Sequence, residues 1–167
     1  MTAQAAFDQY SQAVYDFLFR MTRRADLAED LTQETFLNFV RRPDRFDPAR
    51  GSLKSYLFAI ARNLALKHYR DRDAEEQLDN AELQAWAADP RHLLDAGATV
   101  AAAVATLPPL QQEVLILFEY EGATLEEIAH IAGADVGTVK SRLHRARGRL
   151  RRLLAPQKSG GRVHGTV

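Results

Sequence analysis

The side chains most able to do chemistry in this chain are its arginines and lysines, because they are gathered into two separate blocks. Residues 41–72 hold nine basic and three acidic side chains, and residues 136–167 hold nine basic side chains and no acidic ones. The stretch between the blocks is strongly acidic, so the formal net charge of zero over 167 residues conceals a sorted pattern. Segregated positive charge attracts polyanions. The two blocks therefore favour nucleic-acid binding over a pair of solvated helix faces.

The second basic block follows the pattern of a helix-turn-helix. Thr124 and Glu127 have the spacing of a capping box, so a helix is expected to begin there. Gly133 stands where the turn between the helices needs a residue that tolerates a positive φ, and Asp135 can cap the next helix. Residues 136–154 contain no acidic side chain, whereas a merely solvated helix usually mixes both signs. The pattern predicts a recognition helix for the major groove rather than an ordinary helix pair.

The elements that must position these residues are predicted to be helices. An apolar stripe with helical spacing marks the first helix, at Val14, Phe17, Leu18 and Met21. A second helix is expected to start at Asp26, with Asp26 and Glu29 as a capping box, and to run to about residue 41. A turn-rich loop follows over residues 42–51. A third helix is expected after Ser52, with its end at residues 67–72.

In the C-terminal half, Pro109 is expected to open an apolar helix that ends at Gly122, followed by helices over residues 124–132 and 136–154. The predicted fold is all-α, with two small helical domains joined by an acidic linker and the helix-turn-helix in the second. The expected ranges are a first domain at 1–72, a linker at 73–99, a second domain at 100–154 and a disordered tail at 155–167.

Several classes of function are disfavoured by the composition. The chain has no cysteine, and its scattered histidines have no metal-ligand spacing, so neither a metal nor another cofactor is expected. An enzyme is disfavoured because the clustered acids around Glu29 and Asp30 have no neighbouring histidine and no glycine-rich phosphate loop. No apolar run approaches the roughly 18–20 residues of a membrane span. A cytoplasmic protein without membrane insertion and without catalytic residues is therefore expected.

Six segments of the chain have the form of known sequence motifs. In the second half they are LPPLQQEV at 107–114, TLEEIA at 124–129 and GTVKSRLHRAR at 137–147, and in the first half AEDLTQETF at 28–36, FDPARGSL at 46–53 and YLFAIARN at 56–63. The first three resemble region 4, and the other three regions 2.2 to 2.4, of the extracytoplasmic-function (ECF) branch of bacterial RNA polymerase sigma factors. The resemblance implies a protein that binds core RNA polymerase, recognises the −35 and −10 promoter elements and assists promoter melting.

The resemblance also implies partners. Asp30, Gln33 and Glu34 match positions that bind the β′ clamp helices of core polymerase, and the second domain is expected to touch the β flap. Promoter DNA is expected as a duplex at −35 and as a single strand at −10. Factors of this kind are usually held by an anti-sigma factor, so such a partner is expected here as well.

The −10 strand is expected on the loop at 46–55 and the helix after it. Asn63 matches a position that faces an unpaired base, and Tyr56 and Phe58 can stack on bases, although an aromatic at helical spacing is more often part of a core. Among the cations, Arg62 is the one most expected to point at DNA. The −10 residues implied by the resemblance are Arg50, Lys54, Tyr56, Arg62, Asn63 and Lys67.

In the second domain, the resemblance assigns −35 reading to Lys140, Ser141, His144 and Arg145, and DNA-backbone contacts to Thr138, Arg142 and Arg149. The alternative function is a helix-turn-helix regulator that binds duplex DNA without being a polymerase subunit. That alternative accounts for residues 107–153 but leaves the basic loop and helix at 42–72 unexplained.

Overall fold

A computed structural model describes residues 1–79 and 100–155 of the chain. Within these two ranges the regular structure is helical and contains no strand, which confirms the all-α prediction. None of the helices in these ranges is long and apolar enough to cross a membrane. Residues 80–99 of the predicted linker and residues 156–167 of the predicted tail lie outside the described residues, and the domain boundaries stay predictions.

The first half forms an N-terminal bundle in which three helices pack pairwise. Its elements are α1 (Ala3–Thr22), α2 (Ala25–Arg41), the 3₁₀ turn η1 (Pro43–Arg45) and α3 (Leu53–Asp79). The bundle forms because each helix carries an apolar stripe. The four residues of the predicted first stripe, from Val14 to Met21, are all buried in the core, as are Leu57 and Ala61 of α3.

Two helix ends of this bundle differ from the prediction. Helix α2 begins at Ala25 with Arg24 at its N-cap and no side-chain cap, so the expected capping box at Asp26 is wrong. Asp26 lies in the first turn instead, where the Arg24 guanidinium donates to it at 2.8 Å and lowers the pKa of its carboxyl. Helix α3 continues beyond the expected end at 67–72 as far as Asp79, because no glycine or proline interrupts that stretch.

The second half forms a C-terminal bundle around the helix-turn-helix. Its elements are α5 (Val100–Ala105), α6 (Pro109–Leu115), the π turn η3 (Ile116–Tyr120), α7 (Leu125–Ala132) and α8 (Val136–Leu154). The predicted caps are present: Thr124 Oγ1 accepts from the Glu127 N–H at 3.1 Å, and Asp135 Oδ1 accepts from the Thr138 N–H at 2.8 Å. Gly133 has φ 62°, as the turn requires. The π turn has no counterpart in the prediction.

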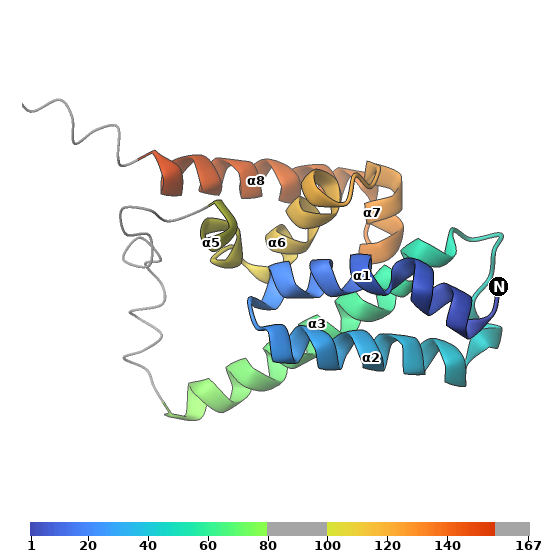
Figure 1. Cartoon of the computed structure of the whole chain (residues 1–167). Helices are drawn as coiled ribbons and strands as arrows, with labels where there is room; N and C mark the ends of the chain where they lie inside the picture. Colours follow the sequence, from blue (N-terminus) through green and yellow to red (C-terminus); the bar gives the residue numbers. More distant parts are fainter. Residues whose placement is uncertain (80–99, 156–167) are drawn as a thin grey trace, which may run out of the picture.

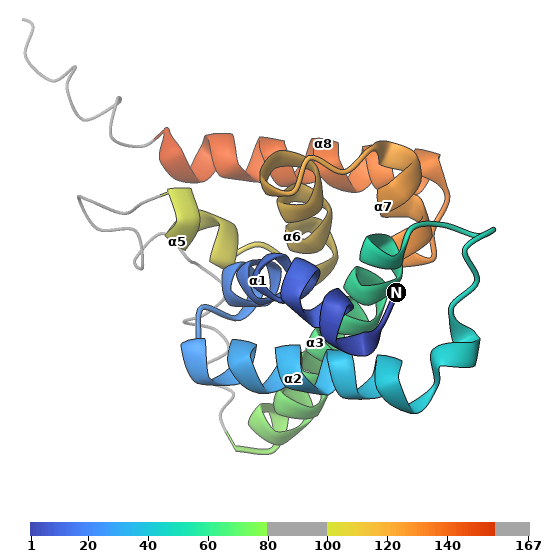
Figure 2. The ribbon, with the colours of Figure 1, turned by 45° about the vertical axis from the view of Figure 1, so that its right-hand side comes forward.

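The two bundles pack against each other in layers (Figure 1). Helix α2 lies on one side and α8 on the opposite side, with α1 and α3 facing α5 to α7 between them, and a rotated view agrees (Figure 2). A single apolar cluster runs through both bundles and includes Phe17 and Leu57 from the first and Val114, Leu117 and Ile128 from the second. The relative orientation of the domains, which the sequence does not indicate, is thus set by a shared core.

One polar contact also ties the bundles together, at the C-terminal end of α1. The last carbonyl groups of a helix have no partner within the helix. The buried side chain of Gln112 in α6 donates from Nε2 to the Met21 carbonyl at 3.1 Å, and the Tyr69 hydroxyl of α3 donates to the same oxygen. A residue of the C-terminal bundle therefore completes a helix end of the N-terminal one.

The cap of α8 gives a test of the helix-turn-helix. Replacing Asp135 by Ala removes the acceptor for the Thr138 N–H, and the midpoint of thermal unfolding should fall by about 2–4 °C. The variant Asp135→Asn should melt near the wild-type temperature, because an Asn side chain caps equally well. Far-UV circular dichroism measures both.

The pH dependence of this difference follows from the same hydrogen bond, which lowers the pKa of Asp135. The contribution of the carboxylate is present above the ordinary aspartate pKa and is lost only as the pH falls through the lowered value. The Ala variant should therefore be destabilised equally at about pH 6 and about pH 8. If Asp135→Asn is as unstable as Asp135→Ala, the charge near the helix dipole, and not the cap, is what matters.

Candidate nucleic-acid interface

A pocket of about 330 Å³ lies where the end of α2 and the turn η1 meet α3, and we call it the α2–α3 pocket. It brings together three residues of the predicted −10 set, Tyr56, Asn63 and Lys67. The full lining is Asn38, Arg42, Arg45, Tyr56, Ile60, Asn63, Leu64, Lys67 and Arg70. The pocket thus combines one aromatic ring, two amides, a short apolar wall and four cations.

The aromatic ring of the pocket is fixed by its neighbours. Tyr56 is half-buried, with its ring centroid 5.4 Å from that of Phe46 and 6.4 Å from that of Phe39. A ring held in this way can stack on a base with little loss of side-chain entropy. Phe58, the other aromatic considered for stacking, is 2% exposed and packs edge-on against Phe17 of α1, so it belongs to the core, as an aromatic at helical spacing more often does. It faces the core because α3 turns that side toward α1.

Two of the pocket cations, Arg42 and Arg45, were absent from the predicted site. Both side chains are exposed and flank Pro43, where η1 turns the chain back toward α3. The signal for them lay in the basic composition of the loop at 42–51, but only the fold brings that loop beside Lys67 and Arg70. Four cations around one small pocket suit the phosphates that flank a captured base.

Arg62 does not line this pocket. Its guanidinium makes a bidentate ion pair with Glu113 of α6, with Nε to Oε2 at 2.6 Å and Nη2 to Oε1 at 3.0 Å. The two side chains are 15% and 0% exposed. The remaining amino group donates to Asn63 Oδ1 at 3.1 Å. In this arrangement, the cation most expected to point at DNA points at the C-terminal bundle.

The other two predicted −10 cations also lie outside the pocket. Arg50 is exposed and is 3.9 Å from Asp47 in the loop before α3. Lys54 is half-buried, with its ammonium 5.7 Å from the centroid of the Phe58 ring. The structure therefore divides the predicted −10 set into two groups. Tyr56, Asn63 and Lys67 line the pocket, and Arg50, Lys54 and Arg62 lie outside it.

Helix α8 presents the predicted −35 readers outward, since Lys140, Ser141, His144 and Arg145 are all exposed. This helix forms the outermost layer of the molecule, on the side away from the N-terminal bundle (Figure 1). A hollow of about 420 Å³ beside it is lined by Gln111, His144, Arg145, Gly148, Arg149 and Arg152. An exposed cationic helix face of this kind suits the major groove and its phosphates.

The predicted backbone contacts of α8 are less exposed. Thr138 and Arg149 are half-buried. Arg142 is also half-buried, and its Nη1 atom is enclosed without a hydrogen-bond partner within the described part of the chain. Arg142 lies close enough to Glu113 to favour the charged form of that carboxylate.

The predicted polymerase-binding residues share the outer face of α2, where Asp30, Gln33 and Glu34 are all exposed. Further along the same helix, Leu37 and Val40 are 48% and 51% exposed. The sequence prediction missed these two apolar residues, although an apolar centre with polar groups at its rim is the usual arrangement of a protein-binding surface. No group of three or more His, Asp or Glu suited to a metal ion occurs in residues 1–79 or 100–155.

Comparison with known proteins gives the family. The family model for sigma-70 region 2 matches residues 6–75, and the model for sigma-70 region 4 matches residues 98–150. CarQ, an RNA polymerase sigma factor of Myxococcus xanthus, is 37% identical over 166 residues, which cover 91% of each chain. The chain belongs to the ECF sigma factors. SigM, an ECF sigma factor of Bacillus subtilis, is 31% identical, over 92% of this chain and 95% of SigM.

Other relatives differ in length or in sequence. SigE of Mycolicibacterium smegmatis is 35% identical, and the match covers 90% of this chain but 61% of SigE. Among solved structures, the sigma factor RpoE of Bartonella quintana, in complex with the anti-sigma factor NepR, has a TM-score of 0.72 at 27% identity, covering 92% of this chain and 96% of RpoE. CnrH, in complex with the cytosolic domain of CnrY, has a TM-score of 0.69 at 25% identity, covering 92% and 87%.

The α2–α3 pocket yields a direct test. Replacing Arg42 by Ala removes one pocket cation, and affinity for a single-stranded oligonucleotide should fall by about three- to tenfold at low salt, because one phosphate contact is lost. Arg41→Ala is the matched control, since Arg41 is exposed at the end of the same helix but does not line the pocket. Fluorescence anisotropy measures both. Equal losses in the two variants would mean that only the overall charge matters.

Proposed function

We propose that this ECF sigma factor binds core RNA polymerase, reads duplex DNA at −35 with α8 and captures the unpaired −10 strand in the α2–α3 pocket. The observation that carries the proposal is the chemical difference between the two cationic surfaces. An unpaired base needs a pocket with a stacking ring and hydrogen-bonding groups, which the α2–α3 pocket provides. A duplex needs an exposed helix that enters the major groove, and α8 is such a helix.

At −10, the Asn63 amide is the group that reads a base edge, because it offers both a donor and an acceptor. Tyr56 stacks on the captured base, and Lys67 holds the neighbouring phosphates with Arg42 and Arg45. Unstacking the base that is trapped costs roughly a few kcal/mol. The release of counterions from the neighbouring phosphates offsets that cost. Arg50 and Lys54 contribute further phosphate contacts, whereas Arg62 can do so only if it leaves the Glu113 carboxylate that holds it in this structure.

At −35, base edges meet Lys140, Ser141, His144 and Arg145. Thr138, Arg142 and Arg149 bind the phosphates on either side. The early turns of a recognition helix reach the bases, whereas cations farther along reach the backbone. The His144 imidazole can donate or accept a hydrogen bond, so this position is compatible with more than one base.

The polymerase surface proposed for α2 combines Asp30, Gln33 and Glu34 with the exposed Leu37 and Val40, and its partner is the β′ clamp. The C-terminal bundle contacts the β flap. We propose an anti-sigma factor as a further partner, since the related RpoE is seen in complex with NepR. This role is in transcription initiation, needs no catalytic residue of the chain's own, and belongs in the cytoplasm with the polymerase.

The division of labour is tested in transcription from a promoter with separately altered elements. With core polymerase, the wild-type chain should give promoter-specific transcripts. Asn63→Ala should lower open-complex formation by about tenfold while duplex −35 binding is retained, and Arg145→Ala should weaken duplex binding by about 1–3 kcal/mol. Permanganate footprinting of the melted strand and a gel shift with −35 duplex separate the two effects.

Two results would count against the proposal. Absence of core binding with intact duplex binding would make the chain a helix-turn-helix regulator instead. Equal loss of melting and of −35 binding in both variants would contradict separate roles for the two bundles. Arg151→Ala is the matched control for the −35 arm, because Arg151 is exposed on the same helix but is not one of the proposed −35 residues.

A further inference from the structure

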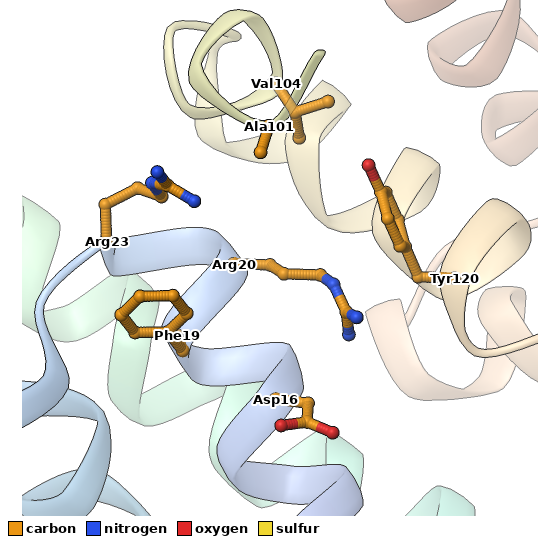
Figure 3. Close-up of a pocket in the computed structure, with 7 residues that line it drawn as sticks. All are labelled: Asp16, Phe19, Arg20, Arg23, Ala101, Val104 and Tyr120. Carbon is orange, nitrogen blue, oxygen red and sulfur yellow. The ribbon is translucent and has the colours of Figure 1, made fainter. Parts of the chain in front are cut away.

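A hollow between α1 and α5 lies apart from the surfaces proposed to bind DNA and polymerase. It encloses about 280 Å³, and none of the residues that line it belongs to the proposed −10, −35 or polymerase-binding sets. Helix α1 contributes Asp16, Phe19, Arg20 and Arg23, and the opposite wall comes from α5 and from Tyr120 of the π turn (Figure 3). We call it the α1–α5 pocket. Its volume is close to the lower end of the range for small-molecule sites, roughly 300–1,000 Å³.

Apolar side chains form the walls of this pocket. Val104 is 2% exposed, and Ala101 lies one turn before it on the same side of α5. The rings of Phe19 and Tyr120 face the pocket from the other two sides, and the Tyr120 hydroxyl lies on the side of α5 (Figure 3). A small molecule with a flat apolar body would bury that body against these walls, which is favourable because it removes apolar surface from water.

The two arginines bring positive charge that is only partly neutralised. The Arg20 guanidinium lies 4.5 Å from the centre of the Tyr120 ring and donates from Nη1 to Glu121 Oε1 at 3.4 Å, its single side-chain hydrogen bond within the described residues. The Arg23 guanidinium lies 5.5 Å from the centre of the Phe19 ring and makes no hydrogen bond or ion pair in that part of the chain. A guanidinium has five N–H donors. Most of the donors at this pocket are therefore available to a ligand.

The backbone at Arg23 is unusual for an arginine. Arg23 is the C-cap of α1, with φ 55° and ψ 24°, and no other non-glycine residue in 1–79 or 100–155 has a positive φ. Glycine is the usual residue in this left-handed position after a helix, because a Cβ atom raises the energy there. Strained backbone that persists in a fold is concentrated at functional sites. An arginine here has an energetic cost, and what it adds is a cation at the pocket.

The end of α1 does not oppose an anion as strongly as a bare helix C-terminus would. The last carbonyl groups of a helix carry partial negative charge. Here the Phe19 carbonyl accepts from the Arg23 N–H at 2.7 Å, and the Met21 carbonyl accepts from Gln112 Nε2 at 3.1 Å. These carbonyls are engaged by the chain itself, so the guanidinium groups dominate the charge at this end of the pocket.

We propose that the α1–α5 pocket binds a small organic carboxylate with a flat apolar body. Its carboxylate lies between Arg20 and Arg23, and its body lies against Val104 and the Tyr120 ring. The planar guanidinium matches the two oxygens of a carboxylate, and the charge-assisted hydrogen bonds between them are strong. Asp16 lines the pocket on the far side of Arg20 from α5 (Figure 3), so a ligand with more than one negative charge is disfavoured.

The test is an NMR titration of the full chain with 2-naphthoate, observed at the methyl groups of Ala101 and Val104. The aromatic body should shift both resonances in a saturable way, with a dissociation constant of about 0.1–1 mM for a ligand of this size. Two other probes separate charge from shape. The neutral 2-naphthamide has the same body without the charge, and inorganic phosphate has charge without the body, and each should bind at least about tenfold more weakly.

Substitution of Arg23 tests the role of the cation. Arg23→Gln should weaken 2-naphthoate binding by about tenfold, because the charge-assisted contact is lost. The matched control is Arg24→Gln, since Arg24 is the next residue and is exposed but pairs with Asp26 and does not line the pocket. Arg23→Gly separates a lost contact from a damaged fold. Glycine suits the positive φ, so this variant should melt at or above the wild-type temperature and still bind as weakly as Arg23→Gln.

Three results would overturn the proposal. One is equal affinity of the wild-type chain for 2-naphthoate and 2-naphthamide, and another is equal affinity of wild type and Arg23→Gln for 2-naphthoate. The third is a set of shifts confined to α8, with competition between 2-naphthoate and −35 duplex, because the anion would then occupy the cationic face of α8. None of these results depends on whether the chain directs core polymerase, so the proposed function is tested separately.

Discussion

The structure depends on how one buried carboxylate is neutralised. Glu113 lies where the two bundles meet, and its charge can remain there because a guanidinium from the other bundle reaches it. The apolar cluster around it is continuous from α1 to α8, so the ion pair is enclosed by side chains rather than by water. Apolar burial is non-directional, whereas a bidentate ion pair forms in only one relative position of its two partners. The shared core therefore holds the two bundles together, and the ion pair favours one alignment of α3 against α6.

The contact between the bundles gives the segregated charges of the sequence a second role besides the proposed DNA binding. The basic blocks meet nucleic acid in the proposed function, but the acidic stretch between them is more than a solvating spacer. Part of it folds against the N-terminal bundle, where Glu113 pairs with Arg62 of the first basic block and Glu121 pairs with Arg20 of α1. Helix α8, which carries most of the second basic block, lies at the outer edge of the molecule (Figure 2), and its Lys140 and Arg145 are exposed. The two proposed DNA-binding surfaces thus differ in this structure: Lys140 and Arg145 of α8 are exposed, whereas Arg62 of the first surface is paired with Glu113.

The sequence was most informative where structure is local. The caps at Thr124 and Asp135, the turn at Gly133 and the opening of α6 at Pro109 could all be predicted, because each depends on residues within one or two turns. The outward face of α8 followed from helical spacing and charge. The expected cap at Asp26 was wrong because packing, and not the cap, determines where α2 begins. The pocket cations Arg42 and Arg45 and the pairing of Arg62 with Glu113 were missed, because they depend on which distant segment the fold brings beside them.

The π turn between α6 and the helix-turn-helix determines how many residues can separate Glu113 from Glu121. Eight residues of a regular α-helix end about 80° past two full turns, so Glu121 would not face the same way as Glu113. The wider π turn over Ile116–Tyr120 takes up part of that offset, and both carboxylates reach the N-terminal bundle. The number of residues between the two glutamates therefore sets the direction in which Glu121 faces relative to Glu113. Loss of a single residue from this stretch would rotate one carboxylate away from its partner, although every residue of the proposed DNA-binding surfaces would still be present.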